Sequence, residues 1–278
     1  MSGAFLAGLM TVGLALLWPG HGLRQEGSGS PFAPPPAPVP PARESTPPAP
    51  SAPPRLAIVV DDLGYEPSRD AEWMKFPEKI TVAVLPFGPS SRKVAESAHN
   101  RGWGVILHVP MEPESEAPDR TEGFRLRRGM AAEEMESLLA RMFEELPEAR
   151  GVSNHMGSAF TADREAMAIF TAALKKRGIF LLDSVTTPKS VALEAARQAG
   201  VPAARRDVFL DPSMKPEEMR RQWEKAVSTA KERGSAILIC HGRLETLRVV
   251  LELLPGLRDE KIRMVTVEEL IESKDKET

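Results

Sequence analysis

Two adjacent carboxylates, Asp61 and Asp62, end an apolar stretch that runs from residue 56 to residue 60. The stretch contains β-branched residues and predicts a buried strand, which in a parallel sheet delivers the next residues to the carboxyl edge where ligands bind. Side-by-side carboxylates repel each other unless a cation or a shared proton lies between them. The pair therefore suggests a divalent metal site in which one carboxylate binds the ion and the other acts as a base. A helix cap or a turn is the alternative use of aspartates in this position.

Three histidines, His108, His155 and His241, also lie where apolar stretches end. A loop hydrogen bond explains each of them alone, but the ends of parallel strands converge on one edge, where the three would face one cleft. Two neutral imidazoles and one carboxylate, with an open position for water, are a common catalytic zinc set. Aspartates at later strand ends are expected to orient the imidazoles, with helix capping or loop hydrogen bonds as the alternative. They are Asp183, Asp207 and Asp211, and Asn154 is expected to support the site in the same way.

Apolar stretches alternate with helical patterns along most of the chain. Strands are predicted at 56–60, 80–85, 104–108, 179–182 and 236–240, with a further short strand before His155. Helices are predicted at 68–76, 89–101, 131–146, 163–177, 189–199, 216–233 and 244–254. Several of these helices end in Arg-Gly, as helix C-termini commonly do, at Gly102, Gly178 and Gly234. Such alternation predicts an α/β fold with a parallel sheet, either open or closed into a barrel.

The composition of the 278-residue chain excludes several classes of protein. The net charge is −3 and the isoelectric point is about 6.1, so no basic field favours a nucleic-acid partner. The single cysteine, Cys240, excludes an internal disulfide framework and a cysteine-rich zinc site. Because it ends an apolar stretch, we expect a buried and inert thiol.

The first 54 residues differ from the rest of the chain. Residues 4–18 are nearly all apolar, which suits a signal peptide or an N-terminal membrane anchor, and residues 25–54 are so rich in proline that they favour an extended spacer. We therefore expect targeting or tethering in residues 1–24, a linker in 25–54, one domain in 55–273 and a polar tail in 274–278. The protein would be exported, either periplasmic or anchored to the membrane through residues 4–18. The oligomeric state is not predicted.

Taken together, six motifs resemble the divergent polysaccharide deacetylase family over residues 55–271. They are Val59-Val-Asp-Asp-Leu-Gly, His108-Val-Pro-Met-Glu-Pro, Asn154-His-Met-Gly-Ser, Leu182-Asp-Ser, Asp207-Val-Phe-Leu-Asp and His241-Gly-Arg-Leu-Glu-Thr. The resemblance implies a distorted (β/α) barrel of about seven parallel strands. It also implies a metal-dependent hydrolase that removes acetyl groups from an N- or O-acetylated cell-envelope carbohydrate.

The resemblance assigns a role to each candidate residue. It implies that Asp61 is the catalytic base and Asp62 a metal ligand. The family's usual His-x-x-x-His motif is absent, so His108 and His155, which follow successive strands, are the expected metal ligands in its place. His241, which ends Leu238-Ile-Cys-His, stands at the position of the family's general acid.

Other features leave the substrate open. A backbone N–H near Asn154 or Gly157 is expected to bind the oxyanion, but the family's Arg-Pro-Tyr motif is absent, which leaves the acetate contacts unassigned. The ligands suit zinc, and cobalt, nickel or manganese would also bind. One alternative is an envelope carbohydrate- or protein-binding module with weak or no catalysis. Another is a metal hydrolase acting on a peptide or phosphate ester, for which Arg205, Arg206 and Arg243 are the available cations.

Overall fold

The structure is a computed structural model that describes residues 52–115 and 120–275. The expected targeting segment and the linker as far as residue 51 lie outside the described residues, as does the end of the polar tail from residue 276. Within the described ranges, no helix combines the length and the apolar character needed to cross a membrane. Export and a tether through residues 4–18 therefore stay predictions.

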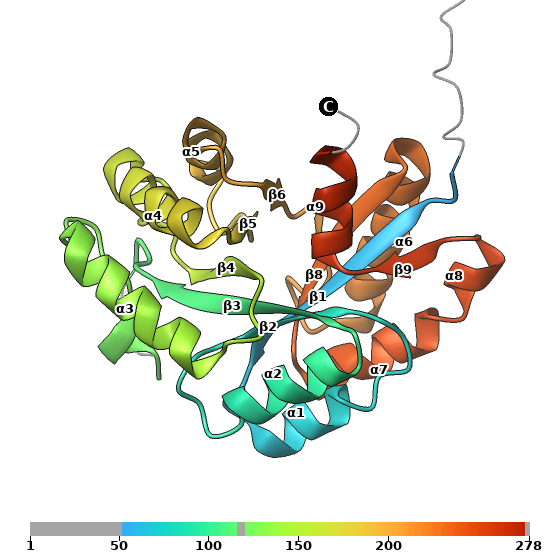
Figure 1. The fold of residues 1–278 in the computed structure, drawn as a ribbon. Helices are drawn as coiled ribbons and strands as arrows, with labels where there is room; N and C mark the ends of the chain where they lie inside the picture. The colour runs from blue at the N-terminus through green and yellow to red at the C-terminus, as the bar shows by residue number, and fades with distance from the viewer. Residues whose placement is uncertain (1–51, 116–119, 276–278) are drawn as a thin grey trace, which may run out of the picture. The chain divides into compact units, whose positions relative to one another are not determined.

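The domain is built on one curled parallel sheet (Figure 1). Its strands are β1 (Arg55–Leu63), β2 (Thr81–Val84), β3 (Gly104–Met111), β4 (Gly151–Met156), β5 (Phe180–Asp183), β6 (Ala203–Arg205), β7 (Val208–Phe209), β8 (Ser235–His241) and β9 (Arg263–Val265). The order is β6-β5-β4-β3-β2-β1-β8-β7, with β9 paired to β1, and the strand pairs are parallel. The predicted α/β class is confirmed. The described sheet has nine strands, where the resemblance implies about seven. The apolar stretches predicted only six of them, because β6, β7 and β9 are too short for such a pattern to reveal.

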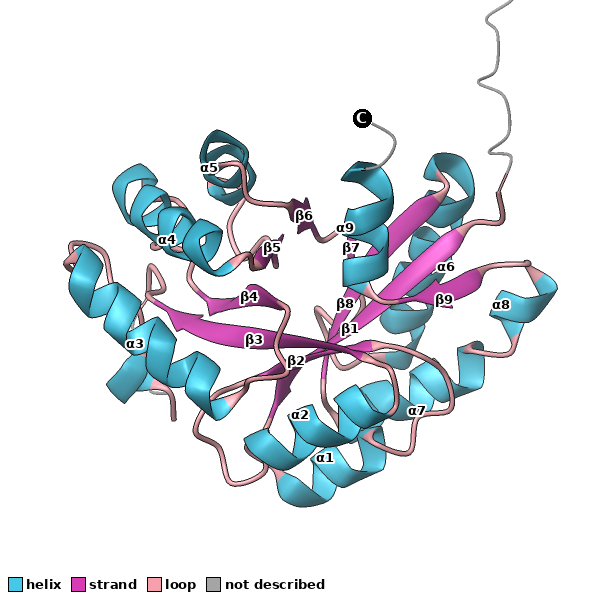
Figure 2. Cartoon of the chain, in the orientation of Figure 1, coloured by secondary structure: helices cyan, strands magenta, loops and turns pink. Residues whose placement is uncertain are grey.

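Helices follow most strands and cover the outside of the curl (Figure 2). They are α1 (Pro67–Trp73), α2 (Ser91–Asn100), α3 (Ala132–Glu145), α4 (Arg164–Arg177), α5 (Ala192–Ala199), α6 (Pro216–Arg233), α7 (Leu244–Leu253), α8 (Gly256–Asp259) and α9 (Val267–Asp275), with a 3-10 turn at Glu122–Phe124. The helix ends agree with the sequence signals. Asp163 caps α4 by accepting from the backbone N–H of Ala166, and Gly178, Gly200 and Gly234 end their helices in the left-handed conformation.

Side-chain alternation divides the core into an outer and an inner layer. The outer layer lies between the sheet and the surrounding helices and contains Cys240, which is fully buried as expected. The smaller inner layer contains alternate strand residues, among them Val59, Ile106 and Ile239, together with Leu270 from α9. Helix α9 thus fills the amino end of the curl. The next inward position on each of these three strands holds a polar residue, at the carboxyl end.

Candidate active site

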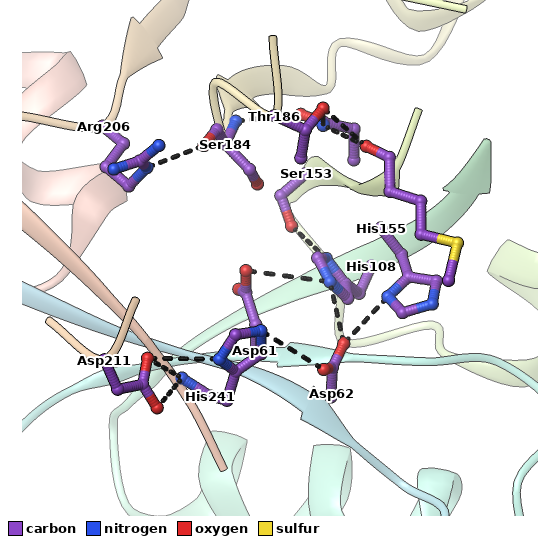
Figure 3. A network of polar contacts seen from close by, with 12 residues as sticks. Asp61, Asp62, His108, Ser153, His155, Ser184, Thr186, Arg206, Asp211 and His241 are labelled. Carbon is purple, nitrogen blue, oxygen red and sulfur yellow. Dashed lines mark hydrogen bonds and ion pairs between the residues drawn. The ribbon is translucent and has the colours of Figure 1, made fainter. Parts of the chain in front are cut away.

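The register of the sheet brings side chains from four strands together at its carboxyl edge. Asp61 on β1 pairs with His241 on β8, and His108 on β3 pairs with Ser153 on β4. His155 points to the same face as Ser153, because it lies two residues further along β4. Asp61 and the three histidines line one pocket of about 510 Å³, and Figure 3 shows them pointing toward a common centre.

Asp62 reaches this pocket because β1 is irregular at its end. Strict alternation after Asp61 would turn the next side chain to the outer face of the sheet. Instead, the pairing of β1 with β2 shifts between Val60 and Leu63, and Asp62 has a left-handed backbone with a φ of 66°. A bulge of this kind re-aims one side chain, and aspartate adopts the left-handed conformation more readily than most residues. Both carboxylates therefore line the pocket.

The start of α1 holds this irregular segment from behind. Arg69 donates from Nη2 to the backbone oxygen of Asp62 at 2.7 Å. The buried carboxylate of Asp70 accepts from the backbone N–H of Gly64 at 2.9 Å and from the Ser90 hydroxyl at 2.6 Å. Gly64 has a φ of 115°, and a Cβ atom there would stand 2.9 Å from a backbone oxygen, so only glycine fits. These contacts fix the direction in which Asp62 points.

Asp62, His108 and His155 form a cluster whose donor atoms suit a divalent metal ion. One ligand atom from each residue lies within 4.8 Å of the other two. Asp62 Oδ1 is 3.3 Å from His108 Nε2 and 2.9 Å from His155 Nδ1. Tetrahedral ligand atoms at zinc bond lengths of about 2.0–2.1 Å stand roughly 3.3 Å apart, which is close to these separations. The three residues therefore fit a small cation.

His108 and Asp62 are in the charge states that metal binding needs. Burial lowers the pKa of His108 from 6.5 to about 4, so the ring is neutral at pH 7. Its Nδ1 lies 2.7 Å from the Ser153 hydroxyl, a contact that orients Nε2 toward Asp62. Burial raises the pKa of Asp62, but hydrogen bonds from His108 and His155 outweigh this and leave the pKa well below 3.8. A neutral imidazole thus faces an ionised carboxylate.

Asp61 lies beside the cluster in an environment that disfavours its ionised form. It is 6% exposed, its Oδ2 is 3.7 Å from His108 Nε2, and its Oδ1 has no hydrogen-bond partner among the described residues. Burial, followed by the charges of Asp62 and Asp211, raises the pKa of Asp61 well above 3.8, while Arg206 acts in the opposite direction. A buried oxygen without a partner is costly. A cation or a bound water beside Asp61 would remove that cost.

His241 is held in place by a buried aspartate. Asp211, which is 1% exposed, lies 3.1 Å from His241 Nδ1 and accepts from the backbone N–H of the same residue at 3.2 Å. The Thr246 hydroxyl donates to the other oxygen of Asp211 at 2.8 Å. With Nδ1 on Asp211, the Nε2 atom of His241 faces the pocket, 3.9 Å from Asp62 Oδ2. An imidazole oriented in this way can give a proton from Nε2. Of the aspartates expected to orient an imidazole, Asp211 is the one that contacts a histidine.

Asn154 and Asp183 do not contact an imidazole and instead hold the loop after β5. The Asn154 oxygen accepts from the backbone N–H of Ser184 at 2.8 Å. Asp183 accepts from the backbone N–H of Val185 and from the Ser190 hydroxyl, both at 2.8 Å. Val185 has a φ of 53°, a strained conformation for a β-branched residue that costs about 1–3 kcal/mol. The expectation that Asn154 and Asp183 support the imidazoles is therefore corrected, because both side chains hold this loop instead.

Asp207 lies away from the site. Its carboxylate accepts from the backbone N–H of Ile237 at 2.8 Å, near the amino end of β8, and pairs with Arg233 at 3.4 Å. The reason is the position of β7, which contains only Val208 and Phe209. Asp207 precedes this strand and Asp211 follows it, so only Asp211 reaches the carboxyl edge. The expectation that Asp207 orients an imidazole is therefore corrected.

The comparison with protein families agrees with this geometry. The sequence pattern of the divergent polysaccharide deacetylases matches residues 58–271, which include every residue of the cluster and its neighbours. The chain belongs to the divergent polysaccharide deacetylase family. The resemblance inferred from the six motifs is confirmed.

Two curated relatives support the family assignment. The chain is 38% identical over 203 residues to the uncharacterized protein YibQ of Escherichia coli K12, a match that covers 73% of this chain and 63% of YibQ. It is also 38% identical over 213 residues to an uncharacterized protein of Haemophilus influenzae, covering 76% of this chain and 74% of that protein. The chain thus spans less than two thirds of the length of YibQ.

A solved structure of an uncharacterized protein from Agrobacterium tumefaciens C58 has the same fold. It superposes with a TM-score of 0.75 at 23% identity, covering 78% of this chain and 89% of that one. At this identity the likeness shows that the two chains share a fold, and it says nothing about activity.

The buried imidazole of His108 predicts a pH dependence of stability. Its pKa is about 4 in the folded protein and 6.5 ordinarily, so between these values the unfolded chain binds more protons. We expect the free energy of unfolding of the metal-free protein to fall as the pH falls from 6.5 to 4, by up to about 1.4 kcal/mol per pH unit from this residue. Urea unfolding at pH 7 and pH 5 measures it. His108→Gln should show a shallower dependence, and an equally steep one would contradict the assignment.

Proposed function

We propose that this protein is a metal-dependent hydrolase that removes acetyl groups from an N- or O-acetylated cell-envelope carbohydrate. The observation that carries the proposal is the placement of Asp62, His108 and His155 within ligand distance of each other, with Asp61 and His241 in the same pocket. Family membership supports a carbohydrate deacetylase. The expected export of the chain supports an envelope carbohydrate as the substrate.

Asp62, His108 and His155 would hold the metal ion, most suitably zinc, although the same donors also accept cobalt, nickel or manganese. A divalent ion bound there would polarise the acyl carbonyl and lower the pKa of water at the site. The unpartnered Oδ1 of Asp61 is consistent with a cation or water as its missing neighbour.

The reaction uses Asp61 and His241 as base and acid. Asp61 accepts a proton from the water whose oxygen attacks the acyl carbon. His241 then donates a proton from Nε2 to the departing nitrogen or oxygen as its bond to the acyl carbon breaks, leaving acetate and a free amine or alcohol. Asp211 stays on Nδ1 and stabilises the ring whenever it carries a positive charge. Asp61 and His241 are register partners on the neighbouring strands β1 and β8, which places the base and the acid side by side.

Release of acetate tests the proposal. The full chain, loaded with zinc, is incubated with acetylated chitooligosaccharides and with peptidoglycan fragments, and acetate is measured enzymatically. We expect release that is lost after chelation and restored by added zinc. The same release from chelated and zinc-loaded protein would contradict metal dependence, and no release from any acetylated glycan would contradict the hydrolase.

The absence of the family's Arg-Pro-Tyr motif favours a second candidate function. In that case the pocket recognises an envelope carbohydrate or protein with weak or no turnover. Glycan binding without acetate release, measured on the same samples, would support this candidate over the first.

A further inference from the structure

Arg206 is a half-buried cation in the wall of the pocket that the proposed reaction does not use. Its Nε donates to the backbone oxygen of Ser184 at 2.7 Å, and its Nη2 donates to that of Val185 at 2.9 Å (Figure 3 shows the contact with Ser184). The guanidinium also stacks on the ring of Phe209 at 4.8 Å. These contacts fix the plane of the group, yet they use only two of its five N–H bonds. The remaining N–H groups are available to an acceptor.

The charge of Arg206 is not neutralised by a direct contact. Exposed arginines such as Arg164 and Arg220 pair with glutamates, whereas no salt bridge joins Arg206 to a carboxylate among the described residues. Burial lowers the pKa of Arg206, and the more distant charges of Asp61 and Asp183 raise it. A guanidinium partly withdrawn from water without an anionic partner costs free energy. A ligand that brings an anionic group would offset that cost.

Ser184 adds a second polar group to the same wall. It is 7% exposed and lines the pocket, and its hydroxyl has no hydrogen-bond partner among the described residues. It lies one residue beyond β5, at the start of the loop that Asn154 holds through the Ser184 N–H. A hydroxyl and a guanidinium held by the same loop therefore adjoin one pocket.

The neighbouring carboxylates do not prevent an anion from binding here. A divalent ion on the cluster would offset the charges of Asp61 and Asp62. The carboxylate of Asp183 accepts hydrogen bonds from Val185 and Ser190, and that of Asp211 is hydrogen-bonded to His241 and Thr246. These donors offset part of the negative potential of both carboxylates. Arg206 then remains as the cation of this wall.

We propose that Arg206 and Ser184 form a subsite for an anionic oxygen group, a carboxylate or a phosphate, carried by the acetylated sugar. The inference rests on the proposed function and narrows its substrate to an acidic glycan. A guanidinium binds the oxygens of such groups through paired N–H bonds, and a hydroxyl supplies one more donor. The ring of Phe209, which contacts both Arg206 and His241 and lines the pocket, adds apolar surface beside the subsite.

Binding of matched charged and neutral glycans tests the subsite. Calorimetry of the zinc-loaded full chain compares a peptide-free peptidoglycan tetrasaccharide, whose N-acetylmuramic residues carry carboxylates, with the same tetrasaccharide after conversion of the carboxylates to amides. A second pair, N-acetylglucosamine 6-phosphate and N-acetylglucosamine, tests phosphate as the source of the charge. We expect the charged member of at least one pair to bind about tenfold tighter or more.

The variants isolate the two groups. Arg206→Gln should bring the ratio of charged to neutral affinity close to one, and Arg206→Lys should restore part of it. Ser184→Ala should lower the ratio without unfolding the loop, because its hydroxyl holds no protein partner. Arg205→Gln is the matched control, since Arg205 is exposed at the end of β6, and it should leave the ratio unchanged. The ratio cancels any general loss of loop geometry in the Arg206 variants.

Two results would overturn the subsite. One is equal affinity for both members of each pair in the unaltered protein, and the other is an equal fall for both members in Arg206→Gln. Because affinity and acetate release are measured in separate assays, preference for the charged glycan without acetate release would contradict the proposed hydrolase alone. Acetate release at the same rate from charged and neutral glycans, with no difference in affinity, would contradict the subsite alone.

Discussion

Asp62→Asn is expected to lower the zinc affinity of the protein by more than about 100-fold and to abolish acetate release. Loss of a group that merely supports a ligand costs about 10–100-fold in metal affinity, and Asp62 is the carboxylate of the cluster itself. Asparagine is chosen because it tolerates the left-handed backbone at this position, so the fold should be retained. Zinc titration and elemental analysis measure the effect.

The matched control for this substitution is Asp207→Asn. It removes a carboxylate from the same sheet at a site away from the cluster, while the new side-chain oxygen can still accept from the N–H of Ile237. Zinc affinity and acetate release should both match the unaltered protein. If Asp62→Asn keeps full zinc occupancy and hydrolysis, the assigned metal centre is wrong.

Asp61→Asn is expected to lower acetate release by about 10²–10⁴-fold while raising the thermal stability of the metal-free protein. Asn cannot accept the water's proton, yet zinc should still bind, since Asp62, His108 and His155 are unchanged. The stability gain arises because the buried, unpartnered carboxylate charge is removed. The melting temperature should rise by about 2–4 °C for each kcal/mol gained.

The pH dependence of that gain has a defined sign. The pKa of Asp61 lies above 3.8 in the folded protein, so the folded state holds the proton more tightly and loses stability as the pH rises through the raised pKa. The advantage of Asp61→Asn should therefore be present at neutral pH and vanish toward pH 3.8. Asp211→Asn gives the contrast. The Asp211 carboxylate is fully hydrogen-bonded, so its loss should destabilise the protein. A fall in melting temperature for Asp61→Asn would contradict the argument.

The sequence was sufficient to locate the candidate site because its residues follow strands of a parallel sheet. Once the strands are parallel, residues such as His108 and His241 must reach one edge, whatever the details of packing. Ser153 was missed, although the same alternation could have found it, since it lies two residues before His155 and points to the same face. Alternation along a strand thus identifies site residues that lie before the strand end, and not only those at the end itself.

The remaining features depend on local geometry that apolar patterns do not encode. Alternation predicts that Asp61 and Asp62 point to opposite faces, and only the bulge held by Arg69 turns both into the pocket. The sequence did not show which of Asp207 and Asp211 reaches the carboxyl edge. The strand between them has only two residues, which is too short to be recognised as an apolar stretch. Arg206 was named only as one of three cations available to a phosphate ester, because the strands on either side of it are too short to show that it lines the pocket.

The sheet ends at β6 on one side and β7 on the other, and the two-residue connection between these ends carries Arg206. Among the described residues no ladder of hydrogen bonds joins β6 to β7, so the length of this seam can change without breaking the pairing of the strands that carry Asp61, His108 and His155. Insertions at this seam would therefore change the lining of the pocket beside Arg206 while the cluster of Asp62, His108 and His155 stays the same. Engineering of specificity should begin there.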